Sequence, residues 1–316
     1  MERMRERQDG MTGQETVRCS ERWNDEWISL QKAGGSFDDA KHWDERAKTY
    51  TTKDSPNAYV EEFIGRSQLR DGDVVLDMGC GNGALALPLA RAGHAVFACD
   101  FSAGMLGLLS QQAVAEGLAG ITTVHMSWED DWAACGLRAN AVDVGFASRS
   151  ISVCDLRRAL LKLSSVAKRR ACITISTGAS PRVDERVLRA ADVAAFEPHD
   201  CVFAYALLVG EGFYPQVSYI ESERCDTFAT REDAVAAFDA MVERALTRPL
   251  SPQERRQAAE RVRAWADENV VENDEAGRPV GRGQVQGAFR LREPRIVRWA
   301  YLTWETGGYD DEAVLR

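Results

Sequence analysis

The chain has 316 residues, of which 45% are hydrophobic and 28% are charged, and its formal net charge is −10. This composition is ordinary for a globular protein, and the length allows one large domain or two small ones. The acidic balance argues against a nucleic-acid partner, because phosphate binding relies on clustered Lys and Arg. No apolar run reaches the length of a membrane span, the amino terminus is polar, and the eight cysteines are scattered without a C-x-x-C pair. We therefore expect a cytoplasmic protein with reduced thiols.

Residues 1–36 are expected to form a polar tail to about residue 20 and then one short helix. Trp23, Trp27 and Leu30 follow the spacing i, i+4, i+7, which predicts an amphipathic helix that buries two indoles. Residues 37–316 are expected to form the main domain. It begins with two further helices, one over 37–50 and one that starts at Pro56.

From residue 74 onward, apolar strand-like runs alternate with helical stripes, which predicts an α/β fold with a parallel sheet covered on both faces. Ser102 and Asp155 are expected to cap two of the helices at their amino ends. The predicted strands are 74–78, 95–99, 121–126, 142–147 and 171–176.

The carboxyl-terminal part is expected to be mainly helical over 181–212 and strand-like over 217–228 and 288–306. Between these strands, Thr230 and Ser251 mark capped starts of two polar helices, and 277–287 is a glycine-rich loop. We interpret 229–287 as a helical insertion into the last β-hairpin. A substrate lid and a decoration without function remain equally open for it.

A turn that is rich in glycine follows the first predicted strand. Gly79, Gly81 and Gly83 occupy alternate positions, and Asp77 precedes them. Glycines allow a ligand to approach the main chain closely. The pattern nominally satisfies the dinucleotide motif G-x-G-x-x-G/A through Ala84, which keeps an NAD(P)-dependent oxidoreductase open. A carboxylate at this point would repel a pyrophosphate, however, whereas it suits a ligand with an ammonium group and no phosphate, such as S-adenosylmethionine.

The sequence Val-Leu-Asp-Met-Gly-Cys-Gly-Asn-Gly at 75–83 closely resembles the first motif of class I S-adenosylmethionine-dependent methyltransferases of the small-molecule type. The resemblance covers about 37–228 and is specific between 74 and 105. It implies a Rossmann-like sheet of seven strands, the last of them antiparallel, an amino-terminal helical lid, and methyl transfer to a small molecule. A non-catalytic module that binds the same cofactor remains an alternative.

The resemblance implies a second motif, which contains Asp100 at the end of the second strand. In such folds an acid at this position accepts hydrogen bonds from the ribose hydroxyls of the nucleotide. Phe101 is expected to pack on the adenine. After the third strand, where relatives often carry an acid, this chain has Ser127 and Trp128 instead, which leaves the adenine contact open. The full set of predicted cofactor-binding residues is Asp77, Gly79, Cys80, Gly81, Gly83, Asp100, Phe101, Met105, Ser127, Trp128 and Ser148.

Ser148 and Arg149 follow the fourth strand, whose carboxyl end opens into the ligand crevice of such sheets. Arg149 could grip an anionic substrate through its planar guanidinium group, or form an ion pair with Asp155. The pattern over 37–50 also resembles the lid of small-molecule methyltransferases, which implies that Trp43 and Tyr50 contact the acceptor; core packing is the alternative.

No general base stands out, and Tyr50 and Arg149 are the candidates for a catalytic role. In-line alignment alone can supply about 7–11 kcal/mol of barrier lowering, so a dedicated base is not required. No histidine spacing indicates a metal site.

Overall fold

The computed structural model describes residues 12–34, 40–48, 58–178, 181, 183–193, 200–246, 248–281 and 284–316. The chain divides into two compact units. The first comprises Met1–Ile175, Asp200–Ser218 and Ala300–Arg316, and the second comprises Ser176–His199 and Tyr219–Trp299.

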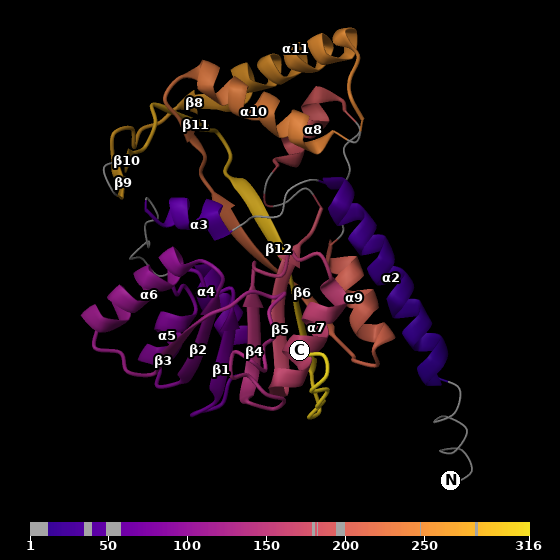
Figure 1. The fold of residues 1–316 in the computed structure, drawn as a ribbon. Coiled ribbons are helices and arrows are strands. Elements are labelled where there is room, and N and C mark those ends of the chain that lie inside the picture. The colour runs from indigo at the N-terminus through magenta and orange to yellow at the C-terminus, as the bar shows by residue number, and fades with distance from the viewer. Residues whose placement is uncertain are drawn as a thin grey trace. The chain divides into compact units, whose positions relative to one another are not determined.

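A seven-stranded sheet with the order β3-β2-β1-β4-β5-β12-β6 forms the centre of the fold (Figure 1). The pairings from β3 to β5 are all parallel, so the predicted Rossmann-like, mostly parallel sheet is confirmed. The strands are β1 (Val74–Met78), β2 (Ala95–Asp100), β3 (Ile121–His125), β4 (Val142–Ser148), β5 (Ala167–Ser176), β6 (Gln216–Arg224) and β12 (Arg295–Glu305).

Strand β5 begins earlier than predicted, at Ala167, and so includes a basic run at its start. Two arginines of this run are neutralised, since Arg169 pairs with Asp73 and Arg170 pairs with Glu305. These long-range ion pairs allow charged residues to continue the strand.

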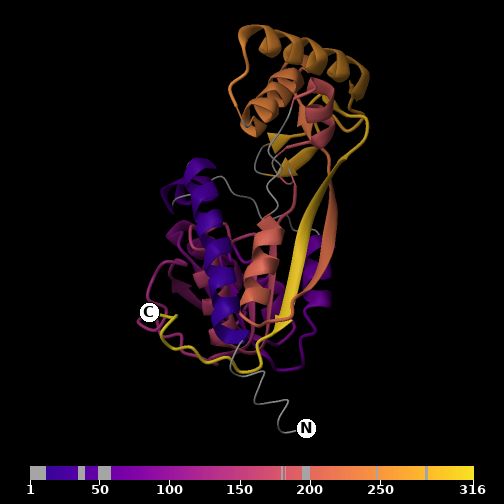
Figure 2. The same ribbon diagram turned by 90° about the vertical axis from the view of Figure 1, so that its right-hand side faces the viewer.

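Helices cover both faces of the sheet (Figures 1 and 2). Helices α5 (Ala86–Arg91) and α6 (Ala103–Ala115) pack against β2 and β3, while α2 (Thr12–Gly34), α7 (Leu156–Val166) and α9 (Asp200–Gly210) pack against one another. The predicted caps are confirmed, because Ser102 accepts a hydrogen bond from the Met105 amide and Asp155 accepts one from Arg158.

The start of α2 corrects the predicted tail. We expected no structure before about residue 20, yet α2 begins at Thr12. The indole of Trp27 donates to the Val153 carbonyl at 2.9 Å, and the rings of Trp23 and Trp27 each lie 5.6 Å from Phe203 on α9. The predicted burial of Trp27 is thereby confirmed, and α2 packs against α9 (Figure 2).

The connection between β3 and β4 departs from the predicted alternation, because residues 126–141 contain turns and no helix. The carboxyl-terminal residues pack there instead. The Trp132 amide donates to the Leu315 carbonyl at 2.7 Å, and the Ser165 hydroxyl donates to the Asp311 carbonyl at 3.0 Å. Leu315 is fully buried and contributes to the core of this unit.

Helices α3 (Ala40–Ala47) and α4 (Ala58–Arg66) precede the sheet. The predicted ends of these helices, including Phe37, Tyr50 and Pro56, lie outside the described residues. Phe63 of α4 packs edge-on against Phe146 of β4 at 5.1 Å, which fixes α4 on the sheet.

The second unit has its own apolar core, in which the ring of Phe238 lies 5.5 Å from Phe228 and 5.3 Å from Trp265. Both predicted capping boxes are present, at Thr230 and Ser251. The glycine-rich segment is not merely a loop, since β9 and β10 pair within it. The elements of this unit are α8 (Glu185–Ala191), α10 (Arg231–Ala245), α11 (Pro252–Asn269), β7 (Thr227–Phe228), β8 (Val270–Glu272), β9 (Pro279–Gly281), β10 (Gln284–Val285) and β11 (Phe289–Leu291).

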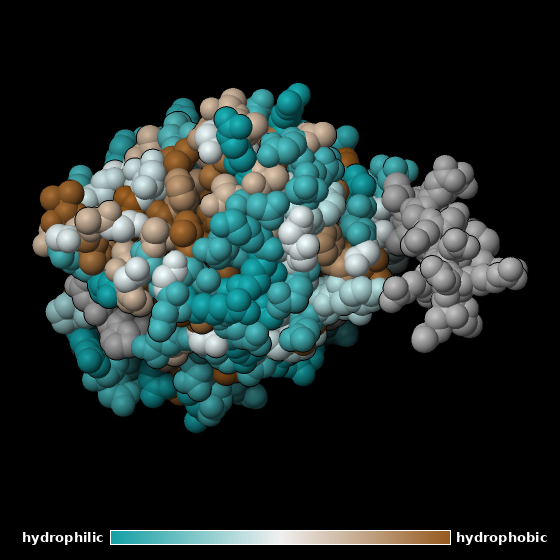
Figure 3. Space-filling view, turned by 90° about the horizontal axis from the view of Figure 1, so that it is seen from below, coloured by the Kyte–Doolittle hydropathy of each residue, from teal (hydrophilic) through white to brown (hydrophobic). Residues whose placement is uncertain are grey.

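The molecular face in Figure 3 is largely hydrophilic, with smaller hydrophobic patches between the polar residues. In the described part of the chain, no helix is long and apolar enough to cross a membrane.

Candidate active site

The glycine turn after β1 has the backbone that its sequence predicts. Gly79, Gly81 and Gly83 have φ of +75°, +53° and +92°, a region that side chains with a Cβ rarely adopt. A Cβ on Gly79 would lie 2.2 Å from that of Ser150, and one on Gly83 would lie 2.3 Å from Leu109 Cδ1. A Cβ on Gly81 would meet nothing within 4 Å. Protein packing therefore requires the outer two glycines, while the middle one borders open space.

Asp77 lies beneath this turn and is almost completely buried, with 2% of its surface exposed. One carboxylate oxygen, Oδ2, has no hydrogen-bond partner. Burial, and then the nearby charge of Asp100, raise the pKa of Asp77 to about 7, against the opposing effect of a bond from the Ala86 amide. A buried carboxylate oxygen that lacks a donor suits an ammonium group and disfavours a phosphate.

Asp100 ends β2 with its carboxylate held by two backbone donors. Oδ2 accepts from the Gly81 amide and Oδ1 accepts from the Ser102 amide, both at 2.8 Å. Each oxygen keeps a further lone pair for the hydroxyl groups of a sugar. Burial raises the pKa of Asp100, which opposes the effect of the two amides.

Asp44 on α3 joins the predicted lid helix to this site, and the sequence analysis missed it. Its Oδ1 accepts from the Ser102 hydroxyl at 2.6 Å and from the Gly104 amide at 2.9 Å, so α3 is held at the amino end of α6. Trp43 is partly buried, and the Arg46 guanidinium lies 5.1 Å from the centroid of its ring. Tyr50 lies outside the described residues, so its predicted role stays a prediction. Asp44 binds the start of a helix that lies about 60 residues further along the chain, and no local sequence pattern marks such a contact.

The loop after β3 presents Ser127 and Trp128. Trp128 is 9% exposed, and its indole donates to the Ser150 carbonyl at 2.8 Å, while its ring lies 5.3 Å from that of Trp132. The Ser127 hydroxyl accepts from the Glu129 amide at 3.2 Å. Trp128 thus belongs largely to the core, and its predicted contact with adenine stays a prediction.

A polar cluster forms where β4 and β5 end. The Tyr59 hydroxyl lies 2.7 Å from Ser148 Oγ and 2.6 Å from Thr174 Oγ1. The Arg149 guanidinium lies 4.3 Å from the centroid of the Tyr59 ring. Arg149 has φ of +59°, and its amide donates to Thr174 Oγ1 at 3.0 Å, which stabilises this unusual backbone. Of these residues, Tyr59 and Thr174 were missed, because each also fits the pattern of ordinary core packing.

Three further predicted residues line the same part of the sheet. Cys80 is 5% exposed and Met105 is 2% exposed, so protein atoms already contact most of their surface, while Phe101 is partly exposed. Burial, and then the charges of Asp77 and Asp100, raise the pKa of the Cys80 thiol, which therefore stays protonated.

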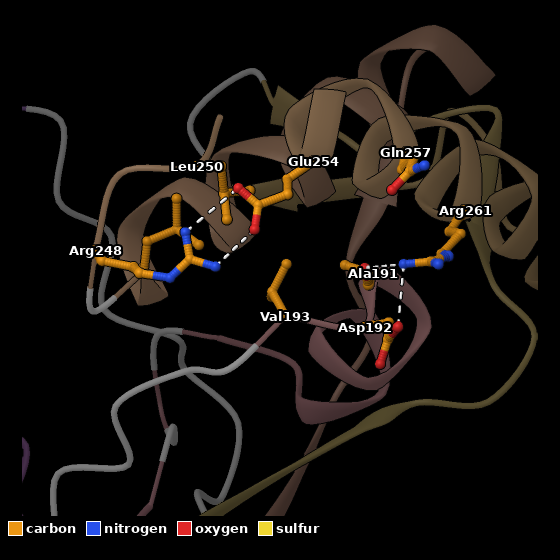
Figure 4. Close-up of a pocket in the computed structure, with 9 residues that line it drawn as sticks. Ala191, Asp192, Val193, Arg248, Leu250, Glu254, Gln257 and Arg261 are labelled. Atoms are coloured by element: carbon orange, nitrogen blue, oxygen red, sulfur yellow. Dashed lines mark hydrogen bonds and ion pairs between the residues drawn. The ribbon is translucent and has the colours of Figure 1, made fainter. Parts of the chain in front are cut away.

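A separate cavity of about 240 Å³ lies in the second unit (Figure 4). Its two arginines are already neutralised, since Arg248 pairs with Glu254 at 2.7 Å and Arg261 pairs with Asp192 at 3.2 Å. The paired charges give this cavity no net attraction for an anion, and we assign it no role. In the described ranges, no group of three or more His, Cys, Asp or Glu residues could hold a metal ion.

Comparison with known proteins agrees with this geometry. Residues 75–170 match the family described as a methyltransferase domain. An uncharacterized protein of Haemophilus influenzae is 30% identical over 265 residues, which cover 83% of this chain and 88% of that protein. The demethylmenaquinone methyltransferase of Thermobifida fusca is 26% identical over 172 residues, covering 53% of this chain and 63% of that enzyme.

Among solved structures, the YcgJ protein of Bacillus subtilis aligns with a TM-score of 0.46 at 15% identity, over 78% of this chain and 97% of that one. The family match over residues 75–170, which contain the glycine turn and both acids, identifies a methyltransferase. The chain belongs to the class I S-adenosylmethionine-dependent methyltransferases, and its cofactor is S-adenosylmethionine.

Proposed function

We propose that the protein transfers the methyl group of S-adenosylmethionine to a small-molecule acceptor at the carboxyl edge of β1, β2 and β4. The buried, unpartnered oxygen of Asp77 carries the assignment of the cofactor to this edge. In the proposal, Asp77 receives the ammonium group of the cofactor, Asp100 receives its ribose hydroxyls, and Gly81 leaves space for it. An NAD(P) pyrophosphate would meet the charge of Asp77 at the same place.

The bound cofactor supplies a methyl group on a positively charged sulfur, and the protein has to align an acceptor with it. Burial raises the pKa of Tyr59, so its phenol is neutral and acts as a hydrogen-bond donor or acceptor, not as a base. Alignment then provides most of the rate enhancement, in line with the lack of an evident base.

The position of Arg149 favours an acceptor that carries a carboxylate or a phosphate. Arg149 is an exposed residue, its guanidinium lies against the Tyr59 ring, and its backbone amide is held by Thr174. A planar cation held in place binds such anions in a defined orientation. The net charge of −10 supports a small acceptor over a nucleic acid. A cytoplasmic location remains part of the proposal, supported by the eight free cysteines.

The test has a binding arm and a turnover arm. Calorimetric titration should detect S-adenosylhomocysteine at micromolar affinity, about −8 kcal/mol, and should detect no NADH binding. Turnover on a panel of acidic metabolites should fall in Arg149→Met and be partly kept in Arg149→Lys. Arg138→Met, at an exposed arginine of the β3–β4 connection, is the control and should leave turnover unchanged. Binding of NADH in place of S-adenosylhomocysteine would refute the cofactor assignment, and full turnover in Arg149→Met would refute the anion anchor.

A further inference from the structure

Lys162 on α7 is a lysine with no exposed surface. Its ammonium group donates to the main-chain carbonyls of Trp128 at 3.1 Å and Asp130 at 2.5 Å. It also lies 5.3 Å from the centroid of the Trp132 ring. All three partners belong to residues 127–132, the loop that follows β3. The ammonium group therefore holds this loop from the inside, where an apolar side chain would leave two carbonyls without a donor.

The same loop is joined to the glycine turn through one intermediate residue. The Trp128 indole donates to the Ser150 carbonyl at 2.8 Å, and the Ser150 hydroxyl donates to the Met78 carbonyl at 2.5 Å. Ser150 also fills the space beside Gly79, since a Cβ added to Gly79 would lie 2.2 Å from the Cβ of Ser150. A displacement of Trp128 is thus transmitted to the first residues of the turn.

The surroundings explain why this position keeps a positive charge. Burial, and then Arg158 on the same helix, disfavour the charged form of Lys162, whereas Glu129, Asp130 and Asp131 on the loop favour it. The Cys135 thiol also lies near Lys162, and burial raises the pKa of that thiol above its ordinary value. The balance lowers the pKa of Lys162 to about 8, so the ammonium form predominates near neutral pH. Hydrogen bonds from a charged donor are roughly twice as strong as those from a neutral one, so deprotonation would loosen the loop.

We propose that Lys162 is a positioning residue for cofactor binding. Its ammonium group fixes the loop 127–132 and, through Trp128 and Ser150, the glycine turn in the geometry that receives S-adenosylmethionine. This inference rests on the proposed placement of the cofactor at Asp77 and Asp100. Lys162 itself does not touch the cofactor.

Calorimetric titration with S-adenosylhomocysteine, well below the melting temperatures of all variants, tests the proposal. Lys162→Met removes the charge at nearly equal length and should weaken binding by at least tenfold. Ser164→Ala is the matched control, because Ser164 is equally buried on α7 and accepts a hydrogen bond from the Trp304 indole at 3.0 Å, away from the loop. This control should lower the melting temperature yet keep affinity within about twofold of the unmodified protein. An equal loss of affinity in both variants would show that Lys162 only stabilises the fold, and would overturn the proposal.

Asp100→Asn separates this proposal from the one on which it rests. If Asp100→Asn weakens binding and Lys162→Met stays within threefold of the unmodified protein, the positioning role is wrong and the cofactor site stands. If neither variant changes the affinity, the cofactor lies elsewhere and both proposals fail.

A pH profile keeps the test decisive if Lys162→Met does not fold. The probe is 5′-methylthioadenosine, which lacks the amino-acid part of the cofactor and its titrating amine. Its affinity for the unmodified protein should decline as the pH rises above about 8, where Lys162 loses its proton. Lys162→Arg keeps its charge at these pH values and should keep the affinity that it has at neutral pH. A flat profile for the unmodified protein between pH 7 and pH 9.5 would overturn the proposal.

Discussion

Asp77 makes the affinity for S-adenosylhomocysteine depend on pH near neutrality. Its pKa is raised to about 7, first by burial and then by Asp100, and its Oδ2 has no donor until a ligand supplies one. The ammonium group of the ligand should bind the ionised carboxylate and gain little from the protonated form. We therefore expect binding to strengthen as the pH rises through about 7.

The size of this effect follows from the fraction of ionised Asp77. With a pKa of about 7, that fraction is about one-tenth at pH 6 and about nine-tenths at pH 8. Affinity should thus rise about tenfold between these values, which corresponds to about 1.4 kcal/mol. Asp77→Asn keeps the shape and removes the charge. It should weaken binding at pH 8 by about 1.5–3 kcal/mol, the usual loss for a hydrogen bond to a charged group.

The stability of the protein without cofactor should change in the opposite sense. The pKa of Asp77 is higher in the fold than its ordinary value of 3.8, so the folded state binds more protons and loses stability as the pH rises from about 4 to about 7. At pH 8 the buried charge of Asp77 therefore lowers the free energy of unfolding by ~4 kcal/mol. An Asn amide without a partner would cost only ~1–3 kcal/mol in its place, so Asp77→Asn should recover ~1–3 kcal/mol. Asp77→Asn should therefore melt at a higher temperature than the unmodified protein at pH 8 while binding more weakly.

Calorimetry from pH 6 to pH 8 and thermal melts at pH 8 measure both effects. Affinity that is constant or falls as the pH rises, or tight binding by Asp77→Asn at pH 8, would refute the pairing of Asp77 with the ammonium group.

Three other substitutions have defined outcomes. Asp100→Ala should weaken S-adenosylhomocysteine by roughly 1.5–3 kcal/mol in calorimetry, and unchanged affinity would remove the ribose assignment. Gly81→Val should lower the melting temperature moderately, because φ of +53° is unfavourable for a β-branched residue, and it should lose binding because its side chain enters the open space beside the turn. Gly79→Val should lower the melting temperature further, because its Cβ also meets Ser150; normal binding by folded Gly81→Val would place the ligand elsewhere. Tyr59→Phe keeps the ring beneath Arg149 and removes the bonds to Ser148 and Thr174, so it should cost about 1 kcal/mol in a denaturant melt and reduce turnover more than cofactor affinity. An unchanged turnover would show that the Tyr59 hydroxyl has only a structural role.

The sequence alone was sufficient for features whose physical cause is local. The caps at Ser102, Asp155, Thr230 and Ser251 were predictable because each side chain accepts from an amide three residues further on. The glycine turn was predictable for the same reason, since positive φ and close approach leave glycine as the suitable residue. Pro88 lies in the first turn of α5, which begins at Ala86, and a proline is tolerated there because the first amides of a helix have no partner within it.

Tertiary structure decided the features that depend on partners far along the chain. Helix α2 packs on α9 through Trp23 and Trp27, which are far from it along the chain. The β3–β4 connection lacks a helix, and carboxyl-terminal residues pack beside it. Tyr59 reaches Ser148 and Thr174 across 89 and 115 residues, a pairing that no local pattern records. The sequence places Asp77 before the glycine turn but does not show that it is buried, and it gives Lys162 no role. Their burial shifts both pKa values toward neutrality, because a charged group removed from water becomes less stable than its neutral form.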